Sequence, residues 1–305
     1  MVSAASVVPT PDRALLQVLE ALRSLDPGGT RIASVIRATF DQLYDGQHTG
    51  RYRLGQLFKT EKTHFGTLFE INLQRELQLA DGDKLDFKIA GHEVDCKYSH
   101  TGAWMLPIES FDEVVLVAQA DDLASVWSLG VVRVIQENRR ASENRDKKTG
   151  LNSLGRSRIV WVFKDAPMQP NALLQLDTSV VDAIMRGRSG QARVNELFRC
   201  ATNRRLSRNI VATVAQQDDF MKRVRENGGA RSALRPEGFV ILGGDYASQR
   251  NIARELGATV PEPGEFVSVK VSPAEPGHGA WIADGWWRLA EPVEDIRVPA
   301  PVVPH

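Results

Sequence analysis

The chain has 305 residues, which is enough for about two domains of ordinary size. With 42% hydrophobic and 25% charged residues it has the composition of a globular protein with a sizeable core, and its longest apolar runs are too short to span a membrane. The formal net charge of zero argues against a uniformly basic nucleic-acid-binding protein.

The distribution of charge is uneven. Between Arg186 and Arg235 there are twelve Lys and Arg residues against four Asp and Glu, and between Arg133 and Arg158 there are eight against three. Local basic segments of this kind can contact phosphates, although many are simply solvated helix faces.

Two cysteines are too few for a disulfide framework, and we expect the chain to reside in a reducing cytoplasm with no secretory signal at its start. The six histidines are scattered, without the H-x-x-x-H or C-x-x-C spacing of a zinc site.

The first half of the chain predicts an α/β domain, over residues 1–163. Helices are expected where apolar residues recur at helical spacing, in 11–25, 30–44 and 64–79. Strands are expected in 84–90, 93–99, 113–118 and 158–163, and the last two, rich in Val, Ile and Trp, should be buried. Gly91 and His92 separate the first two strands and predict a β-hairpin.

The second half has a different character. Prolines and an asparagine predict a linker over 164–176. Short helices are then expected over 178–186, 191–202, 206–215, 217–227 and 248–256, with strands at 239–242 and 266–271. Short helices with small strands indicate a mainly helical winged-helix or helix-turn-helix domain over 177–305, which ends in a flexible Pro/Val tail from Val298.

The predicted hairpin carries a set of residues suited to phosphodiester hydrolysis. That reaction needs a hard divalent cation, held by oxygens next to the scissile phosphate. Asp86 lies on the first predicted strand, and Asp95-Cys96-Lys97 on the second. Side chains two apart on a strand share a face, so Asp95 and Lys97 project together while Cys96 turns into the core and its carbonyl remains available as a further ligand.

A D/E-x-K triplet occurs by chance about once in a chain of this composition, and this chain has three, beginning at Asp86, Asp95 and Asp146. Only the Asp95 triplet has an acidic residue on a strand just before it, across a short turn. The alternative interpretation is an amphipathic hairpin with a charged outer face. Glu70, in the otherwise apolar predicted helix 64–79, either faces solvent or is engaged by a partner.

The order and spacing of Glu70, Asp86, Asp95 and Lys97, together with the stretch 63–100, resemble the NaeI-type (type IIE) restriction endonucleases. The resemblance extends over nearly the whole chain. The likeness implies a restriction-endonuclease-like PD-(D/E)xK domain, with a mixed sheet flanked by helices, followed by a winged-helix DNA-binding domain. This chain departs from the wider superfamily pattern in one respect: the residue before Asp86 is Leu85, whereas that pattern has a proline there.

The resemblance also implies roles and partners. Asp86, Asp95 and the Cys96 carbonyl would bind Mg²⁺, Glu70 would act through water, and Lys97 would stabilise the transition state. A homodimer in the bacterial cytoplasm, part of a restriction-modification system and without a nucleotide cofactor, would cut double-stranded DNA at the palindrome GCCGGC. A second copy of the site would bind the C-terminal domain as an effector.

Basic residues in both halves are candidates for DNA contacts, by guanine recognition or by phosphate binding. In the first domain these are Arg139, Arg140, Arg145, Lys147, Lys148 and Arg156, with Asn152 among them. In the second they are Arg204, Arg205, Arg208, Arg223, Arg225 and Arg231.

The tetrapeptide that begins at Leu43, Leu-Tyr-Asp-Gly, matches the K-x-D-G motif of nucleotidyltransferases such as DNA ligases, except that Leu43 replaces the nucleophilic lysine. We therefore interpret it as a helix end closed by Gly46. The sequence is also compatible with two other functions. The protein could be a non-catalytic DNA-binding regulator, or a structure-specific repair or junction nuclease with the same metal site.

Overall fold

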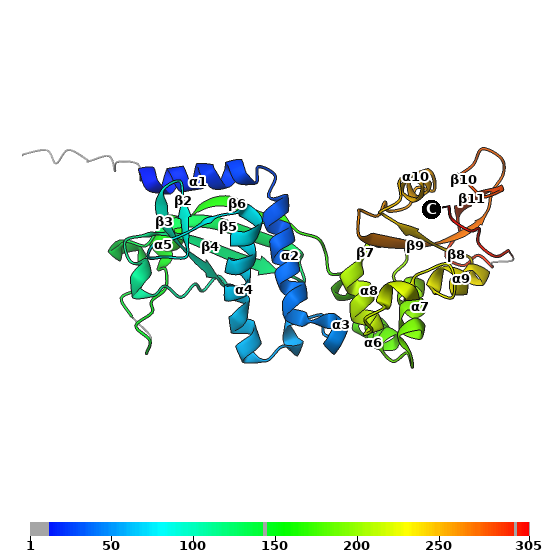
Figure 1. Cartoon of the computed structure of the whole chain (residues 1–305), viewed down its shortest axis with the longest axis horizontal. Helices are drawn as coiled ribbons and strands as arrows, with labels where there is room; N and C mark the ends of the chain where they lie inside the picture. The colour runs from blue at the N-terminus through cyan, green and yellow to red at the C-terminus, as the bar shows by residue number, and fades with distance from the viewer. Residues whose placement is uncertain (1–11, 143–144, 296–297, 305) are drawn as a thin grey trace, which may run out of the picture. The chain divides into compact units, whose positions relative to one another are not determined.

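The computed structural model describes residues 12–142, 145–295 and 298–304, and the chain divides into two compact units (Figure 1). The first unit holds the described residues up to Leu43 together with Phe58–Gln169, and the second holds Tyr44–Leu57 and the described residues from Pro170 onward. Each unit has its own sheet. No helix among the described residues is long and apolar enough to cross a membrane.

The first unit is a mixed sheet with helices. Its elements are α1 (Arg13–Leu25), α2 (Thr30–Tyr44, ending at the unit boundary), α4 (Lys59–Leu77), β1 (Ala80–Asp81), β2 (Phe87–Ile89), β3 (His92–Tyr98), η2 (Ile108–Ser110), β4 (Val114–Asp121), β5 (Val126–Arg133), η3 (Gln136–Asn138), α5 (Ser153–Ser157) and β6 (Val160–Pro167). The strands lie in the order β1-β2-β3-β4-β5-β6. β3 and β4 are parallel, and the other neighbours are antiparallel.

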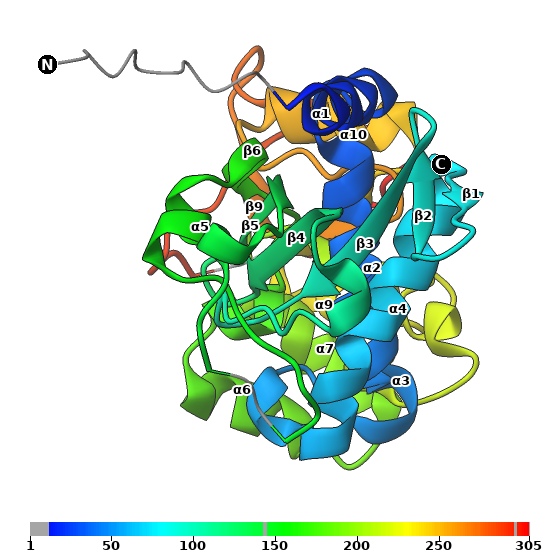
Figure 2. The same cartoon turned by 90° about the vertical axis from the view of Figure 1, so that its left-hand side faces the viewer.

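The two faces of this sheet pack against different segments (Figure 2). On one face the ring of Tyr98 stacks on Phe65 of α4, with 4.1 Å between ring centroids. On the other face Val115 and Val117 belong to a buried cluster with Trp104, in the segment that joins β3 to β4. Because side chains alternate along a strand, residues 95 and 97, paired with 115 and 117, lie on this second face.

The second unit combines short helices with a smaller sheet. Its elements are α3 (Gly46–Thr49), η1 (Leu54–Gln56), η4 (Ala172–Gln175), α6 (Thr178–Met185), α7 (Gly190–Cys200), β7 (Leu206–Ser207), α8 (Arg208–Ala215), η5 (Phe220–Arg223), α9 (Ala230–Leu234), η6 (Arg235–Glu237), β8 (Phe239–Gly243), α10 (Ala247–Glu255), β9 (Glu265–Pro273), β10 (Ala280–Ile282) and β11 (Gly285–Leu289). β9 pairs with β7, β8 and β11. Alternation along β8 buries Phe239 and Ile241 against the helices, and Val240 and Leu242 in a second cluster with α10 residues.

Several sequence predictions for the first unit are confirmed and others are wrong. The hairpin turns at Gly91, but its first strand begins only at Phe87, so Asp86 precedes the strand instead of lying on it. Helix α4 begins at Lys59, where Glu61 accepts from the Phe58 N–H, and not at 64. β5 was not predicted, and β6 is half-buried rather than buried, because it is an edge strand.

The expected linker is not an unstructured spacer. β6 continues through Pro167, and the side chain of Asn171 is buried, with its Nδ2 donating to the Tyr52 carbonyl at 2.9 Å. The division between the units falls between Gln169 and Pro170.

The second unit brings further corrections. The predicted helix 217–227 is only the short 3₁₀ helix η5. Met221 in η5 and Val224 directly after it both pack inward, three residues apart, which is the period of a 3₁₀ helix. The predicted helix 206–215 divides into β7 and α8, and α9, β10 and β11 were not predicted. The terminal segment is not a free tail, because Ala300 and Val303 are buried in the core of the second sheet. Ala300 also exchanges two hydrogen bonds with Arg235.

One buried ion pair ties α2 to the turn after β4. Arg37 pairs with Asp122, and their side chains are only 7% and 3% exposed. Arg31, on the same helix, pairs with Glu76 through side chains that are 41% and 46% exposed. Removing one partner of a buried pair leaves a desolvated charge, whereas an exposed pair contributes little.

Arg37→Ala should therefore lower the free energy of unfolding by about 3–5 kcal/mol, measured by urea denaturation followed by circular dichroism. Arg31→Ala is the matched control, with an expected loss of about 1 kcal/mol or less. Equal losses for the two variants would show that burial of the Arg37 pair does not govern its contribution.

Candidate active site

The candidate site forms where β2 has ended and β3 continues. β2 pairs with β3 only as far as Val94, so the backbone of Cys96 has no strand partner on that side. The carboxylate of Asp86, just before β2, accepts instead from the Cys96 N–H at 2.7 Å through Oδ2. A side chain thus takes the place of a ladder hydrogen bond, which fixes Asp86 next to the strand that carries Asp95 and Lys97.

Three oxygens converge on the ammonium group of Lys97. Its Nζ lies 3.5 Å from Asp86 Oδ2 and 2.9 Å from the Cys96 carbonyl, and it also contacts Asp95 Oδ1. The side chain of Lys97 is 23% exposed, that of Asp86 24% and that of Asp95 5%. The sequence prediction that Asp86, Asp95, Lys97 and the Cys96 carbonyl gather at one place agrees with this geometry.

Burial and like charges shape the electrostatics of the cluster. Burial raises the pKa of Asp95 to about 6, although Lys97 acts in the opposite direction. Burial also raises the pKa of Glu70 on α4, and the nearby charge of Asp86 adds to that rise. Glu70 is half-buried. Glu70 is therefore not a fully solvated residue of the helix, and its carboxylate lies close enough to Asp86, Lys97 and Asp95 to interact with their charges.

The donor set fits a hard cation. Within the described residues Asp95 Oδ2 is buried and has no hydrogen-bond partner, which is costly for a carboxylate oxygen unless a ligand engages it. No group of three or more His, Cys, Asp or Glu side chains placed to hold a metal occurs in the described part of the chain. Here the set consists of two carboxylates and a main-chain carbonyl, which are oxygen donors of the type that Mg²⁺ prefers.

Cys96 itself is buried, and burial raises the pKa of its thiol well above the usual value. Its side chain therefore stays protonated in the core. Only its backbone takes part in the site, through the N–H to Asp86 and the carbonyl to Lys97.

The basic candidates of the first unit differ in their surroundings. Arg139 stacks on Phe111, with its guanidinium 3.8 Å from the ring centroid, and Asn152 caps α5 by accepting from the Gly155 N–H at 2.8 Å. These two contacts stabilise the local fold. Arg140 and Arg156 line one pocket with Lys148, and Arg145 and Lys147 are exposed.

In the second unit three of the six candidate arginines have acidic partners. These pairs are Arg205 with Glu262 and Glu265, Arg208 with Asp245, and Arg223 with Asp219. Arg231 is buried and donates to Gln249 Oε1 at 3.0 Å, and burial lowers its pKa. Arg204 and Arg225 are exposed, and Arg204 contacts Gln175 at 3.4 Å.

The ligase-like tetrapeptide has a structural explanation. Leu43 is buried, and α2 ends at Tyr44. Asp45, not Gly46, adopts the left-handed conformation that ends the helix, with φ of 48°. Gly46 is required for a different reason, because a Cβ there would lie 2.1 Å from Thr213 Oγ1 of α8.

The two-sided mixed sheet of the first unit is the restriction-endonuclease-like α/β fold predicted from the sequence. A family model described as restriction endonuclease NaeI matches residues 16–298. The chain is also 49% identical over 306 residues to the type II restriction enzyme NaeI of Lentzea aerocolonigenes, which covers 97% of this chain and 96% of that protein. The chain therefore belongs to the NaeI family of restriction endonucleases.

Proposed function

We propose that this chain is a magnesium-dependent type II endonuclease that hydrolyses phosphodiester bonds of double-stranded DNA. Family membership supports the activity. The observation that carries the proposal is the convergence of Asp86, Asp95 and the Cys96 carbonyl on the Lys97 ammonium. These oxygens surround one positive charge at a partly exposed edge of β3. Such an arrangement could bind a divalent cation next to a phosphate of the DNA.

The residues have separate roles in this proposal. Asp86, Asp95 and the Cys96 carbonyl would hold the metal, and Glu70 would act through water. A divalent cation at these oxygens supplies Lewis-acid stabilisation of the phosphate. Lys97, held by Asp95, would place its positive charge near the non-bridging phosphate oxygens, where negative charge grows in the transition state.

The order of elements in the second unit supports a winged-helix assignment. From α7 onward the chain runs helix α7, strand β7, helices α8 and α9, strand β8, helix α10 and strand β9, with β9 between β7 and β8 in the sheet. Helices α7, α8 and α9 with the antiparallel strands β7, β8 and β9 follow the order expected for a winged helix, and α10 is an insertion between its last two strands. We therefore assign the second unit to DNA binding, with exposed Arg204 and Arg225 among its contacts.

The proposal extends to specificity and assembly through the family resemblance. The duplex would be cut at GCCGGC by a homodimer, and a second copy of the site, bound by the second unit, would activate cleavage. The basic residues of the first unit would contact the duplex that is cut.

The direct test is to incubate the full chain with plasmid DNA and then sequence the ends. Cleavage should occur with Mg²⁺ or Mn²⁺ and stop with EDTA, because the proposed ligands are hard oxygens. Asp95→Ala should abolish cleavage and leave DNA binding largely intact. Normal cleavage by Asp95→Ala would contradict the metal-site assignment, and ends mapped outside GCCGGC would contradict only the specificity.

Activation by a second site makes a separate prediction. A plasmid with two sites should be cut faster than one with a single site, and an added oligonucleotide with the site should accelerate the single-site reaction, because an effector activates only if it binds the active conformation more tightly. Arg204→Ala combined with Arg225→Ala should weaken that acceleration, measured as initial rates. Arg288→Ala, which removes an exposed arginine paired with Glu294, is the control. Equal rates on both plasmids would rule out the effector role.

A further inference from the structure

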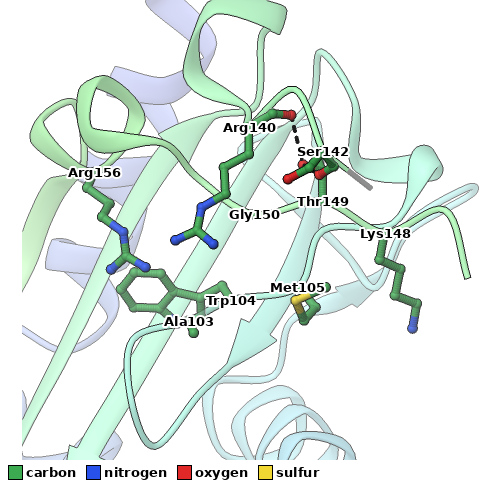
Figure 3. A pocket seen from close by; sticks show the side chains of 9 residues that line it. All are labelled: Ala103, Trp104, Met105, Arg140, Ser142, Lys148, Thr149, Gly150 and Arg156. Atoms are coloured by element: carbon green, nitrogen blue, oxygen red, sulfur yellow. Dashed lines mark hydrogen bonds between the residues drawn. The ribbon is translucent and has the colours of Figure 1, made fainter. Parts of the chain in front are cut away.

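A pocket of about 230 Å³ lies in the first unit, between the segment that joins β3 to β4 and the segment that joins β5 to β6. Figure 3 shows the guanidinium groups of Arg140 and Arg156 on the same side of the Trp104 indole, with Met105 on the opposite side of the opening. Met105 is 42% exposed, so the apolar wall is accessible. The pocket, which Lys148 also lines, thus sets two planar cations against an apolar surface.

Neither arginine has a carboxylate partner within the described residues. Arg140 donates through Nε to the Leu151 carbonyl at 3.3 Å, and Arg156 lies over the Trp104 ring at 5.7 Å from its centroid. Arg158, only two residues further on, is instead paired with Glu137 at 3.2 Å. The donors of Arg140 and Arg156 that face the pocket are therefore available to a ligand.

The walls of the pocket are held in place before any ligand binds. Trp104 is 3% exposed, and its Nε1 donates to the Ala118 carbonyl of β4 at 2.8 Å. On the opposite side the Thr149 hydroxyl donates to the carbonyls of Arg140, at 3.0 Å, and Ser142, at 3.1 Å. A rigid wall of this kind lowers the entropic cost of binding.

The pocket and the candidate active site lie on the same face of the first sheet. Trp104 packs with Val115 and Val117, which are the register partners of Asp95 and Lys97. A duplex whose phosphate reaches Lys97 would therefore run along the face on which the pocket opens.

We infer that this pocket binds the major-groove edge of a guanine in the duplex that is cut, with Arg140 and Arg156 donating to guanine O6 and N7 and Met105 contacting the base. The guanidinium fork matches these two acceptors. A phosphate would suit the arginines but not the exposed thioether of Met105, because an anion is best surrounded by polar donors. The inference rests on the proposed function and specifies which of its basic residues determine sequence preference.

The test uses duplexes in which each guanine of the mapped cleavage site is replaced in turn by 7-deazaguanine, which lacks the N7 acceptor. At one position the replacement should slow single-turnover cleavage by wild type, and weaken its binding, by roughly 5- to 150-fold. Arg140→Ala and Arg156→Ala should cut and bind the normal duplex more weakly but lose this discrimination. Arg140→Lys should also lose the discrimination but keep the salt dependence of binding. A lysine retains the positive charge but lacks the two parallel donors of the guanidinium group.

Arg158→Ala is the matched control and should discriminate as wild type does. If wild type cleaves but no replacement matters, or if Arg140→Ala and Arg156→Ala still discriminate, the pocket does not recognise guanine. A further outcome is that Arg140→Lys still discriminates against the 7-deazaguanine duplex while Arg140→Ala shows a reduced salt dependence of binding. That pair of results would indicate that Arg140 contacts a phosphate, and it would also overturn the inference. If wild type fails to cleave, the proposed function fails, and the same comparison by binding to a GCCGGC duplex decides the inference.

Discussion

The contact of the Lys97 ammonium with Asp95, Asp86 and the Cys96 carbonyl is the interaction on which the rest of the site depends. Two carboxylates and a carbonyl in a partly desolvated place would repel one another without a cation. The lysine offsets that repulsion, and the burial of Asp95 makes the compensation necessary. Removing any member changes the charge balance for the others.

The short first strand of the hairpin makes this arrangement possible. If β2 continued past Phe87 towards residue 84, backbone groups would pair with Cys96, and Asp86 would point away from the strand plane like any other strand residue. Because the ladder of backbone hydrogen bonds stops there, the Asp86 carboxylate accepts the hydrogen bond from the Cys96 N–H. The same oxygen, Oδ2, also lies next to the Lys97 ammonium group. The break in the sheet thus provides the opening in which the oxygens meet.

One face of the first sheet is covered by a helix, and the other carries the charged residues of the candidate site. On one face α4 packs its buried stripe of Phe65, Phe69, Leu73 and Leu77 against the strands, and the aromatic contacts with Tyr98 fix the position of β3. The other face carries Asp95, Lys97 and the Trp104 segment. A strand held rigidly from one side can therefore present charged groups on the other, where a long ligand can lie.

The sequence predicted the elements that have a clear local pattern and missed elements and contacts that no local signal marks. The amphipathic helices α1 and α2 and the turn at Gly91 follow from nearest-neighbour chemistry, and so does the pairing of Asp95 with Lys97. β5 was missed, although its interior is apolar, because it follows β4 after a short turn that lacks the usual Asn-Gly signal. Trp104 and Met105 carry no motif, and only the fold brings them to Arg140 and Arg156.

The measurement that tests the account most directly compares two lysines that each end a D-x-K triplet. Lys88 is on β2, 40% exposed, and pairs with Asp83 at 2.9 Å outside the cluster. Under single-turnover conditions with saturating protein and Mg²⁺, Lys97→Ala should slow DNA cleavage by roughly 10²- to 10³-fold with little change in DNA affinity, because its charge acts on the transition state. Lys88→Ala should cleave within about twofold of wild type, as expected for an exposed ion pair. Equal losses in the two variants, or a normal rate for Lys97→Ala, would contradict the assignment of the catalytic centre.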